Sequence, residues 1–408
     1  MSFSRIALAA LAAALAAPAG AQQPPAQEPA RALTLTREER VALEALQAAA
    51  SGADRAAQDA ALAAARSAAR GGDARYALAH YQLQIGRSRQ DPQMIAQAVD
   101  ALAGSGLAPP GELASLLVNQ ASRAFFAGEF QRADRLLARA AELQPGNGVI
   151  VADRAQLKAR LGERAEAVTL LQRAIQLQQS GGARAPESWH QRALALALEA
   201  RMAPQSIAIA RGLVAAYPTP INWRDALLVY RQAAAPDPAL TLDIGRLMRA
   251  TQALSGERDY LELAQALGGA GLHGEAKAVL DEGIARGMLD PNEPIVRQAL
   301  AATNRALAAE RAGLARLRTQ ALAAPTGAPA RAAGDAHFGH GRYAEAVELY
   351  RAALQKGGED ADLVNSRLGA ALAMAGQRAE AEAVFRSVGG PRADLAGFWL
   401  AWLAERPA

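Results

Sequence analysis

Residues 121–140 read ASRAFFAGEFQRADRLLARA, and residues 155–174 read AQLKARLGERAEAVTLLQRA, which is the same design 34 positions later. Each stretch has a small residue seven positions before a glycine, a second small residue five positions after it, and a leucine four positions further on. Small side chains halfway along two antiparallel helices let the backbones approach closely, and the leucine fills the groove beside them. Glycine suits the sharp turn between the helices. The spacing therefore predicts a helical hairpin of about 34 residues.

The same pattern recurs three more times toward the C-terminus. The intervals between the central small residues, counted from Ala133, are 34, 109, 70 and 35 positions, which are near multiples of one repeat. We therefore expect weaker hairpins in the gaps, at residues 73–106, 189–218 and 223–253, whereas residues 294–324 fit one long helix or a degenerate pair. The later strong copies are Ala264, Gly271, Ala276 and Leu280; Gly334, Gly341, Ala346 and Tyr350; and Gly369, Gly376, Ala381 and Phe385.

These residues resemble the tetratricopeptide repeat (TPR), which has small residues at its eighth, twentieth and twenty-seventh positions and a large one at its twenty-fourth. Pro145, which closes the first strong copy, also fits, although the consensus tryptophan and tyrosine of the first helix are mostly missing. The resemblance implies an all-α solenoid in which antiparallel hairpins form a superhelix. It also implies that the first helices line a concave groove where a protein or peptide partner lies.

Carried over position by position, the resemblance places ten candidate residues in that partner groove. The alternative for each is a solvated polar position. The family's carboxylate-clamp subtype is not expected, because its basic and amide places hold Val118, Ser122 and Asp153, and only Arg192 matches. The candidate groove residues are Asn119, Ser122, Phe126, Asp153, Gln156, Arg160, Glu262, Gln265, Asp335 and Arg367.

The N-terminal residues predict export. Arg5 supplies a positive start, residues 6–17 form an apolar run, and residues 19–21 (AGA) have the small-x-small pattern of a signal-peptidase site. We expect cleavage before Gln22 and a periplasmic location, against the alternative of an uncleaved, amphipathic or buried N-terminus. Because the chain has no cysteine, neither disulfides nor a lipid anchor on an N-terminal cysteine is expected.

The pattern divides the chain into segments of different predicted structure. A signal peptide and a Pro- and Gln-rich disordered spacer precede the first helices. The expected segments are a signal peptide (1–21), a spacer (22–33), N-terminal helices with a degenerate repeat (34–113), TPR-like repeats (114–290), a degenerate pair or long helix (291–326), two TPR repeats (327–391) and a C-terminal capping helix (392–408).

Composition agrees with a helical binding protein. Half of the residues (51%) are hydrophobic and only 4% are aromatic, and the 44 basic and 40 acidic residues are interspersed. Nucleic-acid binding is not expected, because it favours a clustered basic face with aromatic side chains. Local basic patches leave peripheral association with the envelope open, and we expect no transmembrane helix in the mature chain.

Two motifs match known cofactor-binding or metal-binding patterns but lack the surrounding residues that those sites need. Residues 269–274 (GAGLHG) match the dinucleotide fingerprint, but the preceding residues predict a helix where that fingerprint needs a strand. His337 and His340 have a spacing that can bind zinc only with a third ligand, which the sequence does not supply. No serine lies in a G-x-S-x-G elbow. We therefore predict no catalytic residue, cofactor or metal site.

The last helix carries a stripe of large apolar residues at helical spacing. Two interpretations are open: a cap that covers the last hairpin, which solenoids require, or a docking surface for a partner helix or membrane. The favoured interpretation is the cap, because the array would otherwise end on an exposed apolar face. The stripe is Leu395, Phe398, Trp399, Trp402 and Leu403, of which Phe398, Trp399 and Trp402 form the candidate C-terminal surface.

The sequence thus favours a non-enzymatic periplasmic scaffold or adaptor for protein partners, with envelope biogenesis or polysaccharide export as its setting. A second hypothesis is a cell-wall hydrolase or transferase built on a helical superhelix, which would need a catalytic carboxylate in the groove. A third is a structural array that associates with itself.

Overall fold

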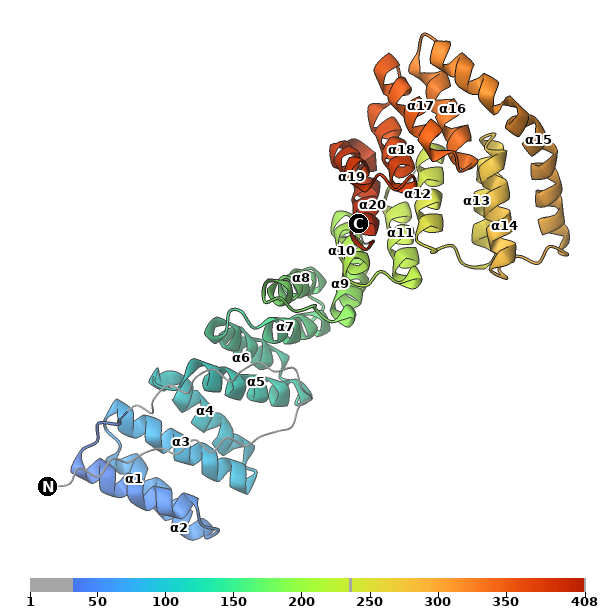
Figure 1. Cartoon of the computed structure of the whole chain (residues 1–408). Helices are drawn as coiled ribbons and strands as arrows, with labels where there is room; N and C mark the ends of the chain where they lie inside the picture. The colour runs from blue at the N-terminus through green and yellow to red at the C-terminus, as the bar shows by residue number, and fades with distance from the viewer. Residues whose placement is uncertain (1–31, 235–236, 407–408) are drawn as a thin grey trace. The chain divides into compact units, whose positions relative to one another are not determined.

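The computed structural model describes residues 32–234 and 237–406, and these residues form helices and no strand (Figure 1). The expected signal peptide and its cleavage point lie outside the described residues. The first ten helices are α1 (Arg37–Ala50), α2 (Arg55–Ala68), α3 (Gly72–Arg89), α4 (Pro92–Ser105), α5 (Pro110–Phe126), α6 (Phe130–Leu143), α7 (Gly148–Arg160), α8 (Arg164–Ser180), α9 (Glu187–Glu199) and α10 (Ala203–Ala216).

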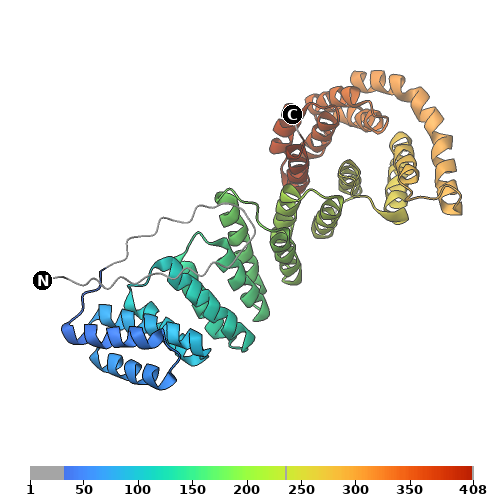
Figure 2. The same cartoon turned by 60° about the horizontal axis from the view of Figure 1, so that its bottom comes forward.

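The remaining helices complete an all-α, TPR-like solenoid in which consecutive helices pack as antiparallel hairpins (Figure 2). They are α11 (Pro220–Ala234), α12 (Pro238–Ala250), α13 (Gly256–Gly269), α14 (His273–Ala285), α15 (Pro294–Ala323), α16 (Gly327–Gly339), α17 (Tyr343–Lys356), α18 (Ala361–Met374), α19 (Arg378–Ser387), the short 3-10 helix η1 (Gly390–Arg392) and α20 (Ala393–Ala404).

The chain divides into two compact units. The N-terminal unit ends at Leu157 and the C-terminal unit begins at Lys158, so the division falls inside α7. The hairpins expected at residues 73–106, 189–218 and 223–253 correspond to α3–α4, α9–α10 and α11–α12. Between residues 291 and 326 the structure has a single helix of 30 residues, α15, and no second one.

The small residues of the repeat are buried between helices and its glycines form the turns, as their spacing predicts. The central small residues Ala133, Ala167, Ala276, Ala346 and Ala381 are all buried, with at most 1% of their surface exposed. The turn glycines of all five strong copies have φ between 69° and 81°, a region that L side chains rarely adopt. Those glycines are Gly128, Gly162, Gly271, Gly341 and Gly376.

In the last two copies the earlier small residue is a glycine because a large ring occupies the space beside it. A Cβ atom added to Gly334 would lie 2.8 Å from the Tyr350 ring, and one added to Gly369 would lie 2.6 Å from the Phe385 ring. Both rings are fully buried. Glycine therefore allows the close helix approach that the ring then fills.

This contact predicts that a glycine-to-alanine substitution destabilises the protein at one position and stabilises it at another. Gly369→Ala should destabilise the C-terminal unit by about 1 to 3 kcal/mol, because the new methyl group overpacks against Phe385. Gly313→Ala, in the middle of α15 with no atom within 4 Å of the added Cβ, should instead stabilise by up to about 1 kcal/mol through helix propensity. Denaturant unfolding followed by tryptophan fluorescence measures both, since all four tryptophans lie in this unit. Midpoints that shift in the same direction would contradict the close approach.

The start of α1 is anchored by a buried carboxylate. Thr36 and Glu39 form the capping box that their spacing predicts, and the Glu39 carboxylate also accepts hydrogen bonds from the backbone N–H groups of Arg70 and Gly71, at 3.0 and 2.7 Å. These backbone donors, Gly71 first and Thr36 next, lower the pKa of Glu39 from 4.5 to about 2. Glu39 thus links α1 to the loop before α3.

The lowered pKa predicts an acid-sensitive N-terminal unit. Above about pH 5 Glu39 is ionised in both states, so its stabilisation is complete. Between pH 4.5 and about 2 the unfolded chain binds the proton first, and the contribution is lost progressively. Glu39→Gln should therefore reduce hydrogen-exchange protection of residues 37–89 at pH 7 and flatten its acid dependence, whereas Glu38→Gln, at an exposed position, should change neither. Equal acid profiles for Glu39→Gln and the parent would refute this.

No helix among residues 32–234 and 237–406 is both long and apolar enough to span a bilayer.

Candidate functional site

The N-terminal unit has a hollow between α5 and α7, which we call the aromatic hollow. Its volume is about 190 Å³, and Phe125, Leu137 and Leu157 are among the apolar residues that line it. Four of the ten residues that the repeat pattern predicted for the groove lie together in its lining. They are Ser122 and Phe126 from α5 and Asp153 and Gln156 from α7.

Phe126 is the most exposed large apolar side chain of the aromatic hollow. Its relative exposure is 85%, although Phe125 contacts it edge-on with ring centroids 5.7 Å apart. The apolar surroundings of Asp153 raise the pKa of its carboxyl group, because they remove water from the charged form. An exposed aromatic ring beside a partly desolvated carboxylate is an arrangement that a partner's apolar side chain and a hydrogen-bond donor can satisfy together.

A second hollow of about 360 Å³ lies on the other side of α5, and we call it the arginine hollow. It contains Asn119, a predicted groove residue, and it shares Ser122 with the aromatic hollow. Ile95, Val99 and Leu116 give it apolar walls, and Arg87 and Arg123 give it charge. The repeat pattern predicted neither arginine for the groove. Arg87 belongs to a weak copy whose register the pattern does not fix, and Arg123 lies beside the predicted Ser122.

Three predicted groove residues of the C-terminal unit are exposed and dispersed. Gln265 lines a hollow of about 470 Å³ with residues of α13 and α15, including the exposed Ile295. Glu262 lines a separate small hollow of about 70 Å³ and pairs with Arg258 at 3.4 Å. Arg160 lies on an exposed part of α7. These positions remain solvated helix surface with no shared geometry in this unit.

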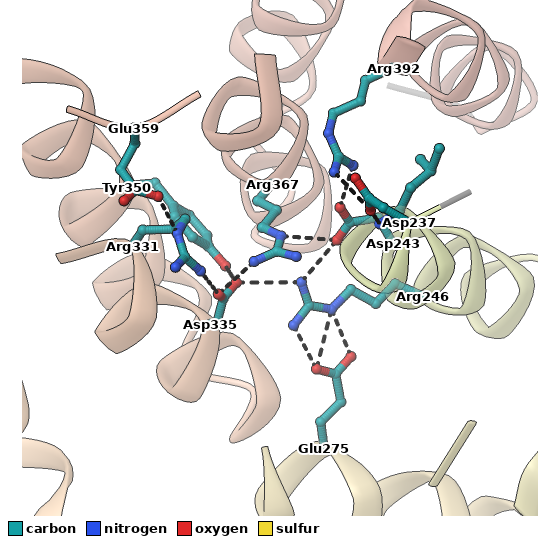
Figure 3. Close-up of polar contacts among 11 residues, drawn as sticks. Asp237, Asp243, Arg246, Glu275, Arg331, Asp335, Tyr350, Glu359, Arg367 and Arg392 are labelled. Carbon is teal, nitrogen blue, oxygen red and sulfur yellow. Dashed lines mark hydrogen bonds and ion pairs between the residues drawn. The ribbon is translucent and has the colours of Figure 1, made fainter. Parts of the chain in front are cut away.

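Asp335 and Arg367 correct the prediction, because they are buried and do not line a groove. Their relative exposures are 4% and 5%. Arg367 donates to Asp335 at 2.6 Å and to Asp243 of α12 at 3.0 Å (Figure 3). In this unit other helices cover both side chains.

The two residues belong to an ion network that links α12, α14, α16, α18 and η1. Asp243 also accepts from Arg392 at 2.8 Å, and Arg246 pairs with Glu275 at 2.8 Å (Figure 3). The Tyr350 hydroxyl donates to Asp335 at 2.7 Å. The members are joined across as many as 149 residues of sequence, so the network holds α12 against the end of the chain.

Arg246 and Arg367 stay protonated in the network. Burial alone would lower the pKa of Arg246, but the carboxylates of Glu275 and Asp335 raise it well above the ordinary arginine value. Burial and Asp335 likewise raise the pKa of Tyr350 far above its usual range, which keeps its hydroxyl protonated as a donor. Such a group of mutually satisfied charges fixes helix positions.

The C-terminal aromatic residues form no exposed surface, which is the arrangement that the cap interpretation expects and the docking-surface alternative does not. Phe398, Trp399 and Trp402 are at most 4% exposed. Phe398 contacts Trp223 and Tyr230 of α11, with ring centroids 6.2 and 5.7 Å apart. Trp399 stacks on Phe385 of α19 at 5.7 Å. Helix α20 therefore covers the last hairpin and also packs against α10 and α11.

The glycine-rich motif and the histidine pair lie at positions where they serve helix packing and turns. The residues between Gly269 and Gly274 form the turn from α13 to α14, so helices flank the glycines on both sides. His337 lies with Nε2 3.3 Å from the Leu314 carbonyl oxygen, and His340 Nε2 lies 3.3 Å from Glu310 of α15. Within the described part of the chain, no three His, Cys, Asp or Glu side chains are placed to hold a metal ion.

No protein-family model matches the chain, and no curated protein matches it in sequence. Among solved structures it is similar to a tetratricopeptide repeat protein of Parabacteroides merdae, at 13% identity and a TM-score of 0.26, over 72% of this chain and 99% of the other. It is also similar to the TPR2AB domain of yeast Sti1, solved as a complex with pHSP90, at 12% identity and 0.26, over 72% and 100%. PilF of Pseudomonas aeruginosa matches at 15% and 0.25, over 64% and 98%.

The classification rests on the hairpins of the chain itself. Five copies share a turn glycine at positive φ, a buried small residue and a buried larger one at fixed offsets, and helices pair with their neighbours along the chain. The protein is a tetratricopeptide-like α-solenoid.

Proposed function

We propose that this chain is a non-enzymatic scaffold or adaptor that binds a protein or peptide partner in the groove of its N-terminal unit. One observation carries the proposal: four predicted groove residues, from two helices, line one hollow with the exposed ring of Phe126 at its edge. An aromatic side chain that is 85% exposed beside apolar walls is typical of a contact surface.

The location and setting belong to the same proposal. The signal-like residues 1–21 support export to the periplasm, and exported scaffolds serve envelope biogenesis, with polysaccharide export as one such setting. A cell-wall hydrolase is less well supported, because glycoside hydrolysis normally uses a pair of carboxylates and Asp153 is the sole acidic residue among those that line the aromatic hollow.

Affinity capture with matched variants tests the proposal. We expect proteins that bind the full chain to be retained by Arg135→Ala, which alters an exposed position of α6 outside the hollow, and to be lost with Phe126→Ala. Circular dichroism should show that both variants melt like the parent. If Phe126→Ala captures the same proteins in the same amounts, the groove is not the binding surface. If the chain captures only itself through Phe126, self-association replaces the scaffold proposal.

A further inference from the structure

We infer that the partner presents an extended segment of polyproline II type, with an acidic side chain for Arg87 and Arg123 and a large apolar side chain, about three residues away, for the aromatic hollow. This inference rests on the proposed function and adds the chemistry of the partner. It follows from the charges, walls and spacing of the two hollows.

The arginine hollow has unbalanced positive charge. Arg87 from α3 and Arg123 from α5 both line it, and no acidic side chain is among the residues that do. Within the described residues neither guanidinium forms an ion pair or a side-chain hydrogen bond. Two convergent guanidinium groups prefer a carboxylate, which each can bind with two parallel hydrogen bonds.

The buried arginines of the C-terminal unit show the contrasting arrangement. Arg246, Arg367 and Arg392 are each paired with at least one carboxylate at 3.0 Å or less. Their charge is already satisfied and 94% or more of their surface is covered. The attraction for an acidic partner is therefore assigned to the arginine hollow, where the arginines face solvent.

The two hollows lie on opposite sides of α5 and share one lining residue. Ser122 lines both, so a segment leaving the arginine hollow passes this small side chain before it reaches Phe126. Neighbouring packed helices lie about 8 to 10 Å apart. An extended chain in the polyproline II conformation advances about 3.1 Å per residue and returns to the same face every third residue, so about three residues separate the two anchoring side chains.

Asp153 determines which polar groups of the partner can lie at the aromatic hollow. Its carboxylate lies in the aromatic hollow, on α7, whereas both arginines lie on the other side, on α3 and α5. A backbone N–H or a polar donor of the partner beside the apolar anchor would satisfy this oxygen. An acidic group at that end of the segment would be repelled.

Selection of random displayed peptides on the full chain tests the inference. We expect enrichment of peptides that carry Asp or Glu about three positions from Phe, Leu, Ile or Trp. The double variant Arg87→Glu/Arg123→Glu should weaken the binding of a selected peptide about 100-fold at low ionic strength, and less at high salt. Arg66→Glu/Arg135→Glu makes the same change in net charge at exposed positions outside both hollows, and should alter binding by no more than about threefold.

The outcomes separate this inference from the proposed function. Selected peptides that need Phe126 but lack an acidic residue, or that tolerate the double reversal at Arg87 and Arg123, would overturn the inference and leave the scaffold proposal standing. If the selected peptides bind Phe126→Ala as well as the parent, the groove itself is refuted. If Arg66→Glu/Arg135→Glu weakens binding as much as the groove reversal, general charge attraction replaces the two-anchor site.

Discussion

Asp243→Ala should lower the free energy of unfolding of the C-terminal unit by about 3 to 5 kcal/mol, because it removes a buried carboxylate that two buried guanidinium groups share. Asp243 accepts from Arg367 at 3.0 Å and from Arg392 at 2.8 Å, and both arginines are 5% exposed. Neither can reach bulk water without moving α18 or η1. Denaturant unfolding followed by tryptophan fluorescence measures the loss.

An exposed ion pair provides the matched control. Asp281 pairs with Lys277 one turn away on α14, and Asp281→Ala should cost no more than about 0.5 kcal/mol. A combined variant, Asp243→Leu/Arg392→Leu, should recover part of the lost stability, because apolar residues replace one buried ion pair while Arg367 keeps its contact with Asp335. Equal midpoints for Asp243→Ala and the parent would mean that the network does not hold the unit closed.

Removal of residues 392–408 should open the C-terminal unit. The deletion takes away Arg392 and the buried rings of Phe398, Trp399 and Trp402, so it uncovers the last hairpin and the facing side of α11 together. We expect aggregation, and new protease cleavage at residues 372–388 and within α11. An exposed apolar face of this kind is unstable in water.

A point variant keeps the test informative if the truncated chain does not fold. Phe398→Ala should cost about 3 to 5 kcal/mol, since Phe398 is fully buried against Trp223 and Tyr230. Ile221→Ala, at a position of α11 that is 71% exposed, should be near neutral. In the parent, Trp399 and Trp402 should emit as buried indoles. Solvent-exposed emission together with unchanged stability after truncation would instead make α20 a docking site.

The fold could be predicted because its signal is local. A turn glycine, a small residue five positions later and a larger residue after it lie within one hairpin, so their offsets survive in the sequence whatever the distant parts of the chain do. The weak copies and the length of α15 were less certain, since Pro294–Ala323 has neither a clear turn nor a regular pattern. There tertiary packing, rather than local residues, decides the structure.

The closure of the C-terminal unit could not be predicted, because its contacts join residues far apart in the chain. Asp243 and Arg392 are 149 residues apart, and the local sequence around either residue does not indicate that the other is its partner. One signal was available: Asp243 and Arg246 lie three positions apart, as the only charged residues within the otherwise apolar or uncharged residues 240–248. Charges on a face that should be buried indicate partners.

The predicted groove residues lie together only where the repeat continues undisturbed. Ser122, Phe126, Asp153 and Gln156 come from two strong copies and lie together, whereas Asp335 and Arg367 come from copies whose inner face is covered. A single sequence fixes which face a residue occupies, but the contacts of the whole unit fix whether solvent reaches that face.

Site-specific photo-crosslinking tests the central claim most directly, namely that the chain binds its partner through the groove of the N-terminal unit. A photoreactive residue at Gln156, which is exposed in the aromatic hollow, should crosslink the full chain to another protein in an exporting host. The same residue at Arg135, exposed on α6 outside the hollow, should give no such product. Crosslinks of equal yield from both positions, or from Arg135 alone, would contradict the account.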